Sequence, residues 1–66
     1  MNAQLLKNKI KENGMNVETF ASKIGINKST MYRKLNLDID TTVAEANEMK
    51  RVLSLSKEDA EAIFFS

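Results

Sequence analysis

Two glycines, Gly14 and Gly25, are the only strong breaks in a chain of 66 residues that contains no proline. The residues between them are mostly good helix formers, and no stretch alternates apolar and polar residues as a half-buried strand does. Glycine tolerates the left-handed backbone conformation with which many helices end. We therefore expect an all-α fold with short helices, two of which end near the glycines.

Capping residues and apolar spacing predict where the helices begin and which side chains they bury. The expected N-caps are Asn16, Asn27 and Ser56, and Thr42 is expected to form a capping box with Glu45. We expect five short helices around one core, beginning near residues 2, 16, 27, 42 and 56. The core residues predicted from helical spacing are Ala3, Leu6, Ile10, Phe20, Ala21, Ile24, Ile26, Met31, Leu35, Ala46, Met49, Leu53, Ala60, Ile63 and Phe64.

The absence of cysteine and histidine excludes several classes of function. Disulfides and thiol nucleophiles are impossible, and the commonest general base and metal ligand is missing. Asp38 and Asp40 are two carboxylates without a third ligand, so we interpret them as part of a solvated loop. We expect one domain over residues 1–66, with no enzymatic activity, catalytic residue, cofactor, metal or small-molecule ligand.

The hydropathy of the chain is typical of a folded protein outside membranes, with 42% hydrophobic and 29% charged residues. No apolar run is long enough to cross a bilayer, and the first residues lack the apolar segment of a signal peptide. We therefore expect a cytoplasmic location and no membrane partner.

Charge is distributed unevenly between the two halves of the chain. Residues 1–36 carry seven basic and two acidic side chains, whereas residues 37–66 carry three basic and seven acidic ones. The halves therefore have net charges of +5 and −4, although the whole chain has a net charge of only +1. This asymmetry fits either two solvated faces or a polyanionic partner for the basic half.

Residues 17–36 carry the most informative pattern. Two short predicted helices are joined by the turn Gly25-Ile26, which is too short for an antiparallel hairpin, so the helices must cross steeply. Ala21 supplies the small side chain that a close crossing needs, and Gly25 supplies the positive φ of a sharp turn. These features predict a helix-turn-helix unit formed by the second and third helices.

The run from Phe20 to Asn36, FASKIGINKSTMYRKLN, resembles the helix-turn-helix of the Cro/repressor (lambda-repressor-like, XRE) family. The five-helix layout is also similar to that of small phage-type members. Two residues depart from the family pattern: Met31 replaces the usual Val or Ile, and Leu37 stands where many members have Gly. The resemblance implies a transcriptional regulator of phage or prophage type, Cro-like or a repressor, that binds a double-stranded DNA operator in a bacterial or phage-infected cell.

The exposed face of the third predicted helix favours the same function on separate grounds. At about 100° per residue, one arc opposite Met31 and Leu35 holds hydrogen-bonding and cationic residues and no acid. This acid-free arc consists of Lys28, Ser29, Tyr32, Arg33 and Asn36, and it is flanked by Thr30 and Lys34. A face that meets phosphates excludes acids, whereas an ordinary solvated face usually mixes both signs of charge.

In the family, the second helix of the unit lies in the major groove with its N-terminal residues against the base edges. Carried onto the matching positions, the resemblance makes Lys28, Ser29 and Arg33 the candidates for base readout. Arg33 could form two parallel hydrogen bonds with a guanine, or could instead contact a phosphate or a surface acid. The candidates for phosphate or flanking contacts are Asn16, Asn27, Thr30, Tyr32 and Asn36.

Several of these candidates also have an ordinary structural interpretation. The two asparagines could serve as caps alone, and Tyr32 could cover Leu35 with its ring instead of contacting a phosphate or a thymine methyl. The lysines of the first predicted helix are expected to attract DNA at long range rather than to make specific contacts. These lysines are Lys7, Lys9 and Lys11.

Phe65 is an aromatic residue that the helical spacing leaves outside the core. It is a candidate contact for a weak homodimer that pairs on DNA, because one recognition helix reads too few base pairs to single out a genomic site. It could instead fold back onto the first helix or fray with the terminus. An alternative function on the same fold is a protein-interaction module, such as an antirepressor or an antitoxin-like partner binder.

Overall fold

The helices begin where the sequence places its capping residues. The computed structural model describes residues 1–37 and 39–65, and within them it has five α-helices and no strand. The helices are α1 (Ala3–Glu12), α2 (Val17–Ile24), α3 (Lys28–Asn36), α4 (Val43–Leu53) and α5 (Lys57–Phe64). The predicted all-α class and the five predicted helices are confirmed.

Every predicted cap accepts a hydrogen bond from an amide in the first turn of its helix. The side-chain oxygen of Asn16 accepts at 2.7 Å, that of Asn27 at 2.8 Å and that of Ser56 at 3.0 Å. Thr42 and Glu45 form the predicted capping box, in which each side chain accepts from the other's backbone amide, at 3.1 and 2.9 Å. These bonds satisfy amides that would otherwise have no partner at the helix ends.

Three helices are followed by a left-handed residue, and the two glycines mark two of these ends, as predicted. Gly14, with φ 72°, follows the last turn of α1, and its amide donates to the carbonyl of Lys11 at 2.9 Å. Gly25 ends α2 with φ 76°, and the following amide of Ile26 donates to the carbonyl of Ala21 at 2.9 Å. Ser54 ends α4 with φ 50°, although serine adopts this conformation at a cost that glycine avoids. No glycine marks this third end, so sequence reasoning missed it.

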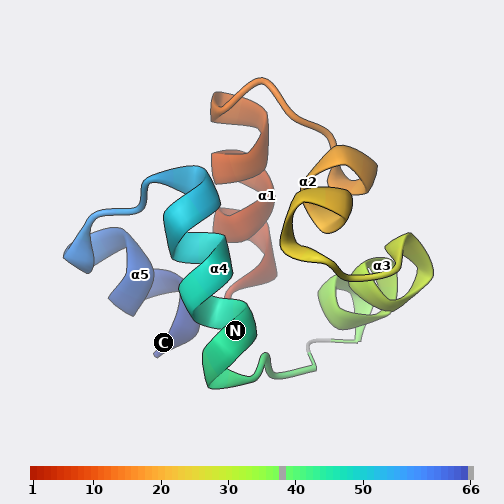
Figure 1. Ribbon diagram of the computed structural model, residues 1–66. Coiled ribbons are helices and arrows are strands. Elements are labelled where there is room, and N and C mark those ends of the chain that lie inside the picture. The colour runs from red at the N-terminus through yellow and green to blue at the C-terminus, as the bar shows by residue number, and fades with distance from the viewer. Residues whose placement is uncertain (38, 66) are drawn as a thin grey trace.

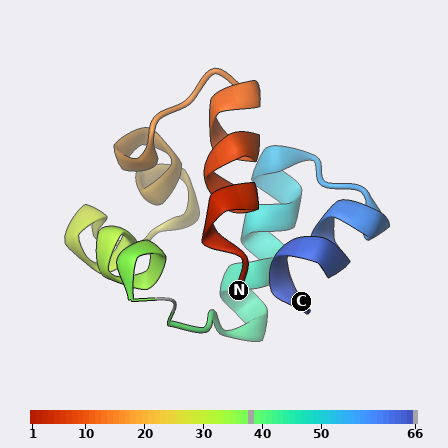
Figure 2. The same ribbon diagram turned by 180° about the vertical axis from the view of Figure 1, so that it is seen from behind.

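The helices are arranged around α1 and α4, which lie in the middle of the molecule (Figures 1 and 2). α5 packs against α1 on one side, while α2 contacts α1, α4 and α3 on the other. α3 therefore lies at the edge of the molecule opposite α5 (Figure 1). The whole is compact, with a radius of gyration of 10.4 Å.

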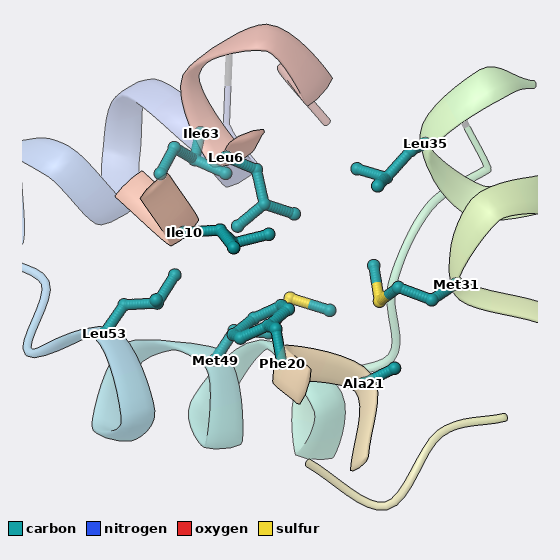
Figure 3. Packing of buried hydrophobic residues seen from close by; sticks show 9 residues of the cluster. All are labelled: Leu6, Ile10, Phe20, Ala21, Met31, Leu35, Met49, Leu53 and Ile63. Atoms are coloured by element: carbon teal, nitrogen blue, oxygen red, sulfur yellow. The ribbon is translucent and has the colours of Figure 1, made fainter. Parts of the chain in front are cut away.

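The core is formed by side chains from all five helices, which point toward one another in Figure 3. The buried apolar residues are Leu6, Ile10, Phe20, Ala21, Met31, Leu35, Met49, Leu53, Ala60 and Ile63.

Five other predicted core residues are only partly buried: Ala3, Ile24, Ile26, Ala46 and Phe64. For these the core prediction was too broad, because a domain of this size has little interior and its helix ends lie at the surface. Ile24 and Ile26 flank the turn at Gly25, and they pack against the edge of the core rather than inside it.

Candidate nucleic-acid interface

α2 and α3 are in contact and are joined by only three residues, 25–27. Ala21 is completely buried in the core cluster that also contains Met31 and Leu35 of α3, as a close approach between two helices requires. On the inner side of α3, Met31 is completely buried and Leu35 nearly so, and both side chains face the core in Figure 3. The opposite side of α3 is therefore the side that solvent reaches.

All five residues of the acid-free arc are exposed, as the helical spacing predicts. Thr30 and Lys34, which flank the arc, are half-buried. Arg33 makes no ion pair and no side-chain hydrogen bond with any described residue, so its guanidinium is available to a partner. Lys28 lies 3.9 Å from Glu18 of α2, an exposed pair that is weak at this distance.

Asn16 and Asn27 use their side-chain oxygens as caps, so their predicted capping role is confirmed. Both side chains are exposed, and their NH2 groups donate to no described residue. Each asparagine can therefore cap its helix and still donate a hydrogen bond to an outside acceptor.

Tyr32 borders a surface hollow of about 350 Å³ between α1, the start of α2, and α3. Tyr32 is 42% exposed, so a partner can reach part of its side chain. The hollow is lined by Lys7, Ile10, Lys11, Met15, Asn16, Val17 and Tyr32. Sequence reasoning missed this grouping, although the spacing of Lys7 and Lys11 by four residues places them on one face of α1.

Lys9 is not among the residues that line this hollow and belongs to a different contact. Its Nζ lies 3.2 Å from Asp59 of α5 and 3.5 Å from Glu12. The hydrogen bond to Asp59 raises the pKa of Lys9, and the same contact lowers the pKa of Asp59. Lys9 therefore joins α1 to α5 and differs from Lys7 and Lys11, with which the sequence groups it.

The described residues include no cluster of three or more side chains of the types that commonly bind metals. Asp38, the first carboxylate of the pair considered above, lies outside them. In the same part of the chain, no helix is long and apolar enough to cross a membrane.

Exposed apolar side chains gather near the joint between α3 and α4 and at the end of α5. Phe65 is 82% exposed and Val43 is 79% exposed, and both line a hollow of about 180 Å³ together with Ala46 and Phe64. Phe65 thus lies outside the core, as the spacing predicts. Its position beside Val43 could not be derived from the sequence, because the two residues are distant along the chain.

Comparison with protein-family models, curated proteins and solved structures gives no match to this chain. The resemblance of residues 20–36 to Cro/repressor proteins therefore stays a prediction.

Proposed function

We propose that this chain binds double-stranded DNA sequence-specifically, with α2 and α3 as a helix-turn-helix unit and α3 in the major groove. The observation that carries the proposal is the acid-free arc of α3, which is exposed along its whole length. A helix of this diameter fits the major groove, where base edges present donors and acceptors. The arc offers the hydroxyls, amide and cations that can bind those groups and the flanking phosphates.

Within the arc, Lys28, Ser29 and Arg33 are assigned to base readout. Arg33 can donate two parallel hydrogen bonds to a guanine, which is worth about 1–3 kcal/mol of discrimination against other bases. Its lack of an ion pair in the described chain supports this role, because no bond within the protein has to be broken first.

The residues around the arc are assigned to the DNA backbone. Asn16 and Asn27 can donate to phosphates from the starts of α2 and α3, where the helix dipole also favours an anion. Tyr32 and the lysines of the neighbouring hollow extend this positive surface onto α1. Thr30 and Asn36 are further candidates for flanking contacts.

The proposed biological role is a Cro-like or repressor-type regulator of a phage or prophage, acting in the bacterial cytoplasm. Such a role needs a site longer than one helix can read, which a symmetric pair of chains provides. Phe65 and Val43, with the hollow between them, supply an apolar surface on which two copies can meet. Its small extent favours a weak dimer that forms on the DNA.

Selection of binding sites from a random DNA pool tests the proposal directly. The wild-type chain should enrich one motif, in two symmetric copies if the dimer forms. Arg33→Ala should lose that enrichment. Arg51→Ala should keep it, because Arg51 is an exposed arginine of α4 that pairs with Glu48 instead of facing α3's arc. Failure of the wild-type chain to enrich any motif would refute sequence-specific binding.

The alternative function, a protein-interaction module, is favoured by one observation, the exposed apolar residues Val43 and Phe65. The two functions respond differently to salt. DNA binding through several phosphates weakens steeply as the salt concentration rises, whereas an apolar protein interface does not. A titration of binding against salt therefore separates them.

A further inference from the structure

Lys34 is the cation of α3 that points away from the acid-free arc. Its side chain is only 12% exposed, and its Nζ lies 3.2 Å from the Oε1 atom of Glu45 in α4. The same Nζ donates to the backbone carbonyl of Asp40 at 3.4 Å. Lys34 is therefore held by the segment that follows α3 and by the first turn of α4.

Glu45 is itself held firmly, because it belongs to the capping box of α4. Its Oε1 accepts from the amide of Thr42 at 2.9 Å, and this bond, aided by Lys34, lowers the pKa of Glu45. The carboxylate thus stays charged at neutral pH and has a set position at the start of α4. Lys34 is attached to a rigid point rather than to a mobile surface acid.

The Lys34–Glu45 pair is placed where it can control the orientation of α3. In residues 1–37 and 39–65, it is the one ion pair that joins α3 to α4. α3 lies at the edge of the molecule, where α2 is its main helical neighbour (Figure 2). Together with the buried side chain of Leu35, the pair therefore holds the last turn of α3 against the body of the protein.

The geometry of base readout makes this orientation important. A tilt of about 10° around Lys34 moves the backbone at Lys28, about 9 Å away along the helix, by about 1.6 Å. Hydrogen bonds tolerate a range of only about 0.5 Å in length, so such a tilt separates the readers from their bases. Phosphate contacts by long side chains are less sensitive, because lysine can adjust its position.

We infer that Lys34 and Glu45 are positioning residues for sequence readout: they set the tilt of α3 without contacting DNA. This inference rests on the proposed function, since it concerns how the same helix meets its bases. Their pairing determines how well a preferred site is distinguished from random DNA.

Two substitutions remove the pair with opposite effects on net charge. Lys34→Met keeps the length of the side chain and removes the cation, and Glu45→Gln removes the anion while a glutamine can still complete the capping box. Loss of an acid by itself strengthens attraction to DNA. We nevertheless expect both variants to lower the ratio of affinities for the selected site and for random DNA, by about threefold to tenfold.

Two matched variants serve as controls. Glu48→Gln removes the same charge from the same helix but disturbs only a pair within α4, so it should leave the ratio unchanged. Lys34→Arg retains a cation that can reach Glu45. This variant should therefore keep most of the wild-type preference for the selected site over random DNA. The inference is wrong if Lys34→Met weakens binding to the selected site and to random DNA equally and Glu45→Gln leaves the ratio of the two affinities unchanged. Lys34 would then be a phosphate contact.

A measurement without DNA separates this inference from the proposed function. Hydrogen exchange of α3 amides should accelerate more than that of α1 amides in both Lys34→Met and Glu45→Gln. If the wild-type chain selects no site, the proposed function fails, and this exchange result alone decides whether the pair orders α3. Equal exchange of α3 in the variants and the wild type would overturn the inference.

Discussion

Replacement of Ala21 by leucine tests the packing of α2 against α3. Ala21 is completely buried, so the three additional carbon atoms have no solvent to enter and must displace neighbouring side chains or backbone. Overpacking of this kind costs about 1–3 kcal/mol. A domain of this length has a free energy of unfolding of roughly 3–10 kcal/mol, so the substitution removes a large part of it.

Thermal unfolding followed by circular dichroism measures the effect. For a domain of this size, each 1 kcal/mol lowers Tm by about 4–8 °C, so we expect Ala21→Leu to lower Tm by roughly 5–20 °C. The matched control is Ala62→Leu, which makes the same change at an exposed position of α5. It should change the free energy of unfolding by no more than about 0.5 kcal/mol. An unchanged Tm for Ala21→Leu would show that the two helices do not pack closely at this residue.

The other predictions concern binding, association and stability. Lys7→Ala should weaken binding to selected and random DNA equally and reduce the slope of binding against salt by about one unit; a loss confined to the selected site would contradict a phosphate contact. Phe65→Ser should keep the helical content and the binding of a single half-site but abolish cooperative binding to paired half-sites, as measured by gel shift; retained cooperativity would place the dimer contact elsewhere. The folded-state pKa of Glu45 is lowered, chiefly by the Thr42 amide, so its contribution to stability is present above its ordinary value of 4.5 and is lost as the pH falls through the lowered value. Melts of Glu45→Gln between about pH 6 and pH 3 should therefore depend less on pH than those of the wild type. Ser54→Gly should raise the free energy of unfolding by about 0.5–1 kcal/mol, because glycine adopts the left-handed cap more easily, and a lower Tm would show that the serine side chain stabilises this turn.

Charge at the proposed interface could be anticipated only in part. The spacing of α3 predicts that Lys28, Arg33 and the other residues of the acid-free arc are exposed, because the burial of Met31 determines which side faces outward. It does not reveal that Lys34 is withdrawn from this surface, since its partner Glu45 lies on another helix. The same limit applies to Lys9, which the sequence groups with its neighbouring lysines and the structure joins to α5.

The sequence by itself determined the positions of the helices, because capping is a local effect. Each capping side chain accepts a hydrogen bond from an amide two or three residues further along, so no distant part of the chain is needed. This holds for Asn16, Asn27, Thr42 and Ser56. The glycine at the end of α2 acts equally locally, through its own backbone angle.

Only the tertiary structure decided which of the surface residues meet one another. The pairing of Lys34 with Glu45 and the placing of Phe65 beside Val43 both depend on packing between different helices. Such contacts are selected by the shape and volume of the shared core, which no short stretch of residues contains. Helix periodicity gives the side on which a residue lies, and the packed core determines what lies opposite it.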